Sequence, residues 1–295
     1  MPIIDFLQIS PTAFITVAAI LGLLIGSFLN VVIYRLPLMM EAEWRQQCAE
    51  LAGQSDTSPQ PAINLITPRS RCPHCGHAIT ALENIPVLSY LALKGACSAC
   101  GKAIGLRYPL IEALTGVLTA LVAWHFGWGW QAAAACVLTW ALIALSMIDL
   151  DHQLLPDSIT LPFLWIGLTL SLYGTTGLFT DTHSSIIGAL AGYLSLWLVY
   201  QVFKRLTGKE GMGYGDFKLL ALFGAWLGWQ MLPAIILLSS LVGAAVGISL
   251  ILVRGRDRNL PIPFGPYLAA AGWIALLWGG QITQSYLSWM RGTGN

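Results

Sequence analysis

Charged side chains are scarce in this sequence of 295 residues. Asp, Glu, Lys and Arg make up 10% of it and hydrophobic residues 56%, whereas a soluble chain carries roughly a quarter charged residues. The 15 basic and 14 acidic residues give a formal net charge of +1, so no basic field would attract nucleic acid. These scarcities exclude soluble, disordered, collagen-like and secreted disulfide-rich chains. The composition indicates a multi-pass membrane protein, and its 12 tryptophans fit aromatic belts at the membrane surfaces.

Long runs without Asp, Glu, Lys or Arg mark the expected membrane spans, since a helix needs about 20 apolar residues to cross the hydrocarbon layer. Two runs are interrupted, by 127–130 (Gly-Trp-Gly-Trp) and by Gly228-Trp229, so each predicts two helices joined by a short hairpin. We expect an all-α polytopic membrane protein with about eight transmembrane helices. The sixth, 219–228, is short and would borrow residues from 213–218 or be partly inserted. The uncharged runs are 6–34, 113–148, 158–180, 182–203, 219–253 and 259–290.

The basic residues predict the orientation. All but one of the Lys and Arg residues fall within 35–107, 204–218 and 254–258, which are alternate loops of the eight-helix arrangement. The positive-inside rule places these loops in the cytoplasm and both termini outside. The first span has no basic segment before it and no small-residue cleavage site, so we expect it to be retained.

This topology predicts three parts: a first transmembrane helix (1–35), a cytoplasmic domain (36–107) and a seven-helix transmembrane domain (108–295). The cytoplasmic loop has about 70 residues, near the lower limit for a self-supporting core, so a metal is expected to hold it together. Residues 55–61 are expected to form an exposed linker within it.

Four of the six cysteines occur in a repeated motif, Cys-x-x-Cys-Gly-[His/Lys]-Ala-Ile. Two residues between cysteines allow both thiolates to bind one ion from a tight turn, and the glycine that follows tolerates a positive φ. We therefore predict one structural zinc ion, with no open position for substrate, bound by Cys72, Cys75, Cys97 and Cys100.

The alternative to zinc is a pair of disulfides or a redox switch, which a reducing cytoplasm and the absence of a thioredoxin-like pattern disfavour. His74 and His77 are expected at the surface rather than as ligands. Cys48 and Cys136 are expected to be packing or inert thiols.

Acidic residues at membrane depth are costly and mark function. Asp149 ends one expected helix and Asp216 begins another, and the intervening helices bring the chain back to the same membrane face. Two carboxyl groups in one partly dehydrated site supply a general base and a general acid for hydrolysis without a nucleophilic Ser or Cys. Buried aspartates also serve transporters, so this pair alone does not separate the two classes.

Other carboxylates have competing interpretations. Asp151 is the main rival of Asp149, although it and His152 also fit a solvated loop. Asp157 follows Pro156 before a helix, which predicts an N-cap. Glu112 opens the second span as a weak candidate for methyl-transfer chemistry, or as a carboxylate that only stabilises the helix start.

Five motifs, in this order, resemble those of the bacterial type IV prepilin leader peptidase/N-methyltransferase family over nearly the whole chain. They are 26–37 at the end of the first span, the paired cysteine knuckles with 107–112, the segment 149–157, the Gly-x-Gly-Asp segment 213–218, and 263–267.

The resemblance implies an inner-membrane aspartic protease that removes the short basic leader of type IV prepilins and of type II secretion pseudopilins. It implies that Asp149 and Asp216 are the catalytic pair and that the four cysteines bind zinc. It also implies methylation of the new N-terminal amine, usually on Phe, with S-adenosyl-L-methionine. The sequence contains no phosphate-binding or Rossmann-type signature for that donor, so methylation rests on the resemblance alone. A leader with Lys and Arg would stay in the cytoplasm, where Asp151 or Asp157 could attract it.

Overall fold

The computed structural model describes residues 3–53, 63–174, 177–254 and 263–290. Within these ranges the chain is helical, with two isolated β-bridges and no strand. It forms two compact units, Met1–Ala132 and Ala133–Asn295, each described here by itself. The predicted linker 55–61 lies outside the described residues. The all-helical prediction is confirmed.

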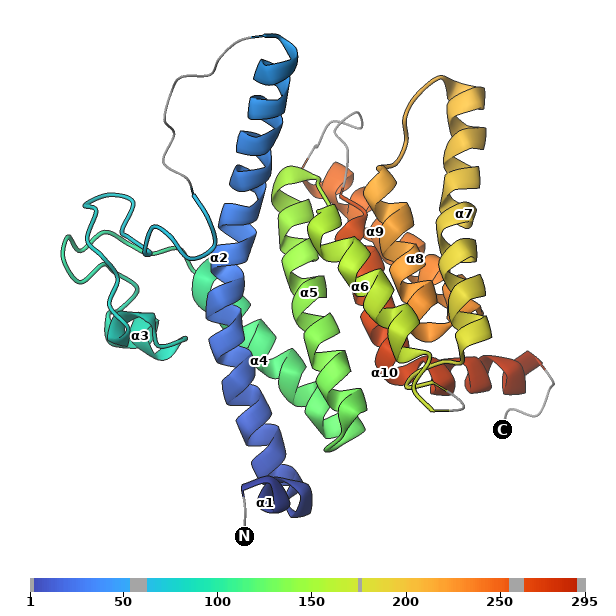
Figure 1. Ribbon diagram of the computed structural model, residues 1–295, viewed down its shortest axis with the longest axis horizontal. Helices are drawn as coiled ribbons and strands as arrows, with labels where there is room; N and C mark the ends of the chain where they lie inside the picture. Colours follow the sequence, from blue (N-terminus) through green and yellow to red (C-terminus); the bar gives the residue numbers. More distant parts are fainter. Residues whose placement is uncertain (1–2, 54–62, 175–176, 255–262, 291–295) are drawn as a thin grey trace. The chain divides into compact units, whose positions relative to one another are not determined.

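The first unit is built on two long helices in close contact (Figure 1). Helix α2 (Pro11–Leu51) follows the short α1 (Ile3–Ile9), and α4 (Arg107–Phe126) packs along it. A Cβ at Gly22 would lie 2.6 Å from Thr119 Oγ1, and one at Gly26 would lie 2.7 Å from the Cα of Glu112. Small residues therefore let the two backbones approach closely, as is usual for helices packed within a membrane.

Helix α2 does not end where its apolar run ends. It continues unbroken past Arg35 to Leu51, and its last two turns are exposed and polar. The predicted division of the chain into three parts, at 35/36 and 107/108, stays a prediction. Helix α2 passes through 35/36 without a break, so the secondary structure marks no boundary there.

Between α2 and α4 lies a loop with little regular structure, the 3₁₀ turn η1 (Leu82–Asn84) and the short helix α3 (Leu88–Ala92). Arg35 is buried and donates to the backbone oxygens of Asn64 (2.9 Å) and Pro68 (2.6 Å). The beginning of the loop is thus bound to α2 at Arg35, the first charged residue after the apolar run of that helix.

The second unit is a succession of six helices that alternate in direction in Figure 1. Close backbone contact joins α7 and α8, since a Cβ at Gly188 would lie 2.3 Å from the carbonyl oxygen of Gly224. Ser185 adds a hydrogen bond of 2.6 Å to the Ala225 oxygen. The helices are α5 (Trp130–His152), α6 (Asp157–Leu170), α7 (Thr182–Thr207), α8 (Tyr214–Leu227), α9 (Leu232–Arg254) and α10 (Gly265–Met290).

The two predicted hairpins are confirmed. Helix α4 ends at Phe126 and α5 begins at Trp130, while α8 ends at Leu227 and α9 begins at Leu232 after the 3₁₀ turn η2 (Trp229–Met231). Gly127 and Gly228 have φ of 66° and 80°, which only glycine adopts without strain.

A helix occurs at each of the eight predicted positions, but the count of eight spans is not confirmed. Five helical segments in the described part of the chain are long and apolar enough to cross a membrane. Helices α6 and α8 have 14 residues each, about 21 Å at 1.5 Å per residue. The evidence that this is a membrane protein comes from the five segments that meet both criteria of length and hydropathy. They are Pro11–Leu51, Arg107–Phe126, Trp130–His152, Thr182–Thr207 and Trp229–Ser249.

Candidate active site and metal centre

Asp149 and Asp216 both lie buried in the second unit. Asp149 is in the last turn of α5 and is 5% exposed, and Asp216 is in the first turn of α8 and is 7% exposed. In Figure 1 the end of α5 and the starts of α6 and α8 lie at the same end of this unit. Leu155 links their surroundings, since it lies 3.2 Å from a Cβ placed at Gly265, which contacts Asp149, and 2.8 Å from one placed at Gly215, next to Asp216. The fold thus brings together the two predicted carboxylates.

Gly265, the first residue of α10, contacts Asp149 directly. Its backbone N–H donates to Asp149 Oδ2 at 3.0 Å. The first amides of a helix have no partner within the helix, so this carboxylate satisfies one of them. Gly265 belongs to the 263–267 motif, which suggested no role until the fold placed it against Asp149. A Cβ at this position would lie 2.7 Å from Asp149 Oδ2, so glycine keeps the approach open.

Leu155 lies between two of the segments that form the site. It is 8% exposed and comes from the short connection between α5 and α6. A Cβ at Gly215 would lie 2.8 Å from the Leu155 Cβ, and one at Gly265 would lie 3.2 Å from Leu155 Cδ2. The second glycine of Gly-x-Gly-Asp therefore serves packing against Leu155, next to the acidic residue.

The expectation that Asp157 caps a helix is wrong. Pro156 is the N-cap of α6 and no side chain accepts a capping hydrogen bond there. Asp157 is the first helical residue, and its carboxylate accepts from Lys218 Nζ at 2.7 Å. Lys218 belongs to the Gly-x-Gly-Asp segment, so the ion pair joins the starts of α6 and α8. Asp151 is exposed near the end of α5, unlike the buried Asp149.

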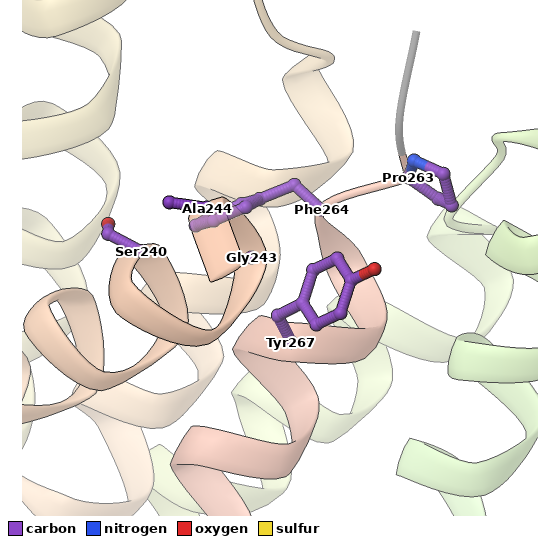
Figure 2. Close-up of a pocket in the computed structure, with 6 residues that line it drawn as sticks. All are labelled: Ser240, Gly243, Ala244, Pro263, Phe264 and Tyr267. Carbon is purple, nitrogen blue, oxygen red and sulfur yellow. The ribbon is translucent and has the colours of Figure 1, made fainter. Parts of the chain in front are cut away.

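A hollow of about 260 Å³ lies beside the start of α10 (Figure 2). Its walls come from one side of α9 and from the residues on either side of Gly265. Figure 2 shows Phe264 extending toward α9, and a Cβ at Gly243 would lie 3.9 Å from Phe264 Cδ2. The hollow therefore opens next to the residue that binds Asp149. It is lined by Ser240, Gly243, Ala244, Pro263, Phe264 and Tyr267.

The four predicted cysteines converge in the first unit. One ligand atom from each lies within 4.8 Å of all the others, and the Sγ atoms of Cys72 and Cys100, and of Cys75 and Cys97, are 3.9 Å apart. Four thiolates at 2.3 Å around a tetrahedral zinc ion would be separated by about 3.8 Å. The arrangement fits one zinc ion and does not contain a disulfide, since all the described cysteines are free.

The two knuckles repeat the same backbone geometry. In the first, the Cys72 amide donates to the His77 oxygen (2.9 Å), and in the second the Cys97 amide donates to the Lys102 oxygen (2.9 Å). Gly76 and Gly101 have φ of 72° and 68°, as the repeated glycine predicted. Backbone N–H groups of Cys75 and His74 donate to the Cys72 sulfur and lower the pKa of that thiol, whereas burial and the other cysteines raise the pKa of Cys75. A thiolate is the form that binds a metal ion.

Glu83 joins the two knuckles. Its carboxylate accepts from Ser98 Oγ in the second knuckle and from the Thr80 amide (2.8 Å), and these hydrogen bonds lower the pKa of Glu83 to about 2. His77 contacts the same carboxylate at 3.3 Å, so it is occupied outside the cysteine cluster. His74 and Cys48 are exposed, and Cys136 lies within α5, away from the cluster.

Glu112 is a buried carboxylate that binds the loop to α4. It is 9% exposed and accepts from the Val87 amide at 2.8 Å. The geometry gives this residue a structural partner, while its suggested part in methyl transfer stays a prediction.

Comparison with known proteins agrees with these features. The model of the bacterial peptidase A24 N-terminal domain matches residues 20–126, and that of the type IV leader peptidase family matches residues 136–248. The chain is 57% identical over 288 residues to the prepilin leader peptidase/N-methyltransferase of Stutzerimonas stutzeri, covering 98% of this chain and 99% of the relative. The chain belongs to the type IV leader peptidase family.

Proteins with the same name from two other bacteria have similar identities. That of Pseudomonas aeruginosa is 57% identical over 97% of this chain and 98% of the relative, and that of Aeromonas hydrophila is 56% identical over 94% and 95%. No solved structure matches the chain. The predicted resemblance is confirmed.

Proposed function

We propose that this membrane protein cleaves the leader of type IV prepilins and then methylates the new N-terminus with S-adenosyl-L-methionine. The relatives carry the name of both activities over nearly the full length of the chain. The single observation that carries the peptidase half is the pair of buried carboxyl groups, Asp149 and Asp216, at one end of the second unit.

Asp149 and Asp216 are the proposed catalytic residues. One carboxylate takes a proton from a water molecule as that water attacks the scissile carbonyl carbon, and the other carboxyl group donates a proton to the leaving amine. The amide of Gly265 fixes the orientation of the Asp149 carboxylate. Burial limits the competing solvent around the pair, so the charge of the ionised carboxylate acts more strongly on the reacting atoms than it would in water.

Cys72, Cys75, Cys97 and Cys100 are the proposed ligands of one structural zinc ion, which would complete the fold of the loop. S-adenosyl-L-methionine would supply the methyl group. We assign no binding residues to this donor.

The proposed location is the bacterial inner membrane, with the loop that contains the cysteines in the cytoplasm and both termini in the periplasm. The basic residues of 35–107, 204–218 and 254–258 support this orientation. A substrate with a basic leader and an apolar helix would then present its scissile bond at the cytoplasmic boundary. The hollow beside Gly265 would hold an apolar side chain next to that bond. Pseudopilins of type II secretion share this chemistry as substrates.

Asp151 is the proposed attraction point for the Lys and Arg of the leader. It is exposed near the end of α5, the helix whose last turn also holds Asp149. Asp151→Lys should raise KM for a basic leader and leave KM for a neutralised leader unchanged. An unchanged KM for both would remove this part of the proposal.

One assay separates the candidate functions. Purified protein in detergent is incubated with a prepilin and labelled S-adenosyl-L-methionine. Leader loss with label transfer supports the bifunctional enzyme, and leader loss alone supports a peptidase without methyltransferase activity. If neither leader loss nor label transfer occurs, the result favours a transporter or assembly factor, because buried aspartates also serve in transporters.

A further inference from the structure

The segment 82–91, which we call the leucine tip, exposes large apolar side chains. Leu82, Leu88 and Leu91 are 78%, 65% and 66% exposed, and Ile85 is 40% exposed. The tip comprises η1, the residues between η1 and α3, and the first four residues of α3. Such a cluster marks a contact surface for a membrane, another protein or a ligand.

Two hydrogen bonds hold the tip against membrane-spanning helices of the same unit. Ser27 Oγ of α2 donates to Asn84 Oδ1 (3.4 Å), and the Val87 amide donates to Glu112 of α4 (2.8 Å). Both partners lie inside helices that are long and apolar enough to cross a membrane.

These contacts fix the position of the tip along the two helices, which can be measured from their first charged residues. Ser27 precedes Arg35 by eight positions, so it lies about 12 Å deeper along α2 at 1.5 Å per residue. Glu112 follows Arg107 by five positions, about 8 Å deeper along α4. Figure 1 agrees, because α3 lies closer to the α1 end of the unit than the start of α4 does. Interfacial segments are buried by about 5–10 Å in the headgroup region.

The backbone at Val87 supports a fixed position. Val87 has φ 60° and ψ −46°, an outlier for a β-branched residue. Such a conformation persists only where surrounding contacts determine it, and here Glu112 holds the amide of that residue.

The apolar surface continues from the tip onto α4. Leu110 and Leu114 of this helix are 63% and 45% exposed, as expected for side chains that face lipid. Lys94, just beyond α3, is exposed and can extend its ammonium group to the aqueous side.

We propose that the leucine tip inserts into the bilayer interface, so that the loop with the cysteine cluster is anchored to lipid as well as to α2 and α4. The occupant of this surface is the headgroup and upper acyl region of the membrane. Because Glu83 belongs to the tip and contacts His77 of the first knuckle and Ser98 of the second, the cysteine cluster would be held at a fixed distance from the lipid surface. This proposal does not depend on the proposed catalytic activity.

The test measures which phase surrounds single side chains of the full-length protein in lipid nanodiscs. Trifluoromethyl-phenylalanine is incorporated at Leu88 or Leu91, which leaves every cysteine in place. Relaxation of the fluorine signal is measured with dissolved oxygen, which concentrates in the bilayer, and with a water-soluble nickel chelate. Leu114 on α4 is the lipid control and Gln47, exposed on the far end of α2, is the water control.

We expect Leu88 and Leu91 to show an oxygen-to-nickel relaxation ratio matching Leu114 and several-fold above that of Gln47. A ratio equal to that of Gln47 would overturn the proposal, since the tip would be in water. Protection from both reagents would also overturn it, because another part of a protein would then cover the tip. Zinc content, measured on each labelled protein, shows that the loop is folded before a ratio is scored.

Discussion

The amide of Gly265 and the carboxylate of Asp149 are joined by a hydrogen bond of 3.0 Å across 116 positions of the sequence. The start of α10 is therefore part of the candidate active site, together with the end of α5 and the start of α8. A contact of this kind fixes a carboxylate more firmly than its own side-chain torsions can, since one of its oxygens is held by the backbone.

Gly265→Ala should lower kcat for leader cleavage by about 100-fold, as misplacement of a catalytic group by about 1 Å can do. The added Cβ would lie 2.7 Å from Asp149 Oδ2 and displace it. Gly280→Ala on the same helix is the matched control, because nothing lies within 4 Å of a Cβ there. Steady-state cleavage of a prepilin measures both. Equal kcat in the two variants would show that Gly265 does not position Asp149.

Asp149→Asn and Asp216→Asn should each reduce cleavage by about 10²- to 10⁴-fold, the usual contribution of a general acid or base. Both variants keep the shape of the side chain, so the protein should remain in the membrane. Leader removal is followed by the change in mass of the substrate.

Asp157→Asn serves as the comparison for these two variants, since Asp157 is exposed and paired with Lys218. It should retain most of the cleavage activity. If it lost as much activity as Asp149→Asn, the assignment of the catalytic pair would have to be revised. Methylation of a substrate from which the leader has already been removed should survive in all three variants.

Cys72→Ser should release the metal and destabilise the loop, because three thiolates leave a tetrahedral zinc site incomplete. We expect methylation to fall more than cleavage. Metal analysis of the purified protein, with both activities, measures the effect. Cys48→Ser is the control, since Cys48 is exposed and lies outside the cluster. An equal fall in the two activities would indicate that the loop also positions the leader.

Ala244→Phe should fill part of the hollow between α9 and α10 and raise KM for prepilin cleavage by about 10-fold, a typical effect of a changed apolar pocket. Ala245→Phe adds the same group at the neighbouring exposed position, which does not line the hollow. The KM for prepilin cleavage is measured for both variants under the same conditions. Indistinguishable KM values would mean that the substrate does not use this hollow.

Much of the fold was predictable because charge and glycine mark its boundaries. Uncharged runs predicted a helix at each of the eight positions, and the Gly-Trp pairs predicted both hairpins. The extension of α2 to Leu51 was not predicted, because a polar helix outside the membrane carries no hydropathy signal. The short lengths of α6 and α8 leave the number of spans open.

The candidate site was predictable only in part. The Cys-x-x-Cys spacing identified the four cysteines, and the free-energy cost of a carboxylate at membrane depth identified Asp149 and Asp216. Both arguments need only the residues near each position in the sequence. Gly265, Lys218 and Leu155 could not be assigned roles, because each acts through a contact that exists only after the helices pack. Asp157 was misread for the same reason: its sequence context fits a cap, but a distant lysine determines its partner.

Leu155 packs against two glycines: Gly215, which precedes Asp216, and Gly265, which begins α10. One aliphatic side chain thus sets the spacing of two segments that belong to different helices. A smaller side chain at this position would weaken the packing of both segments. Leu155 is therefore the position at which the active site could be enlarged for bulkier substrates without changing the acidic residues.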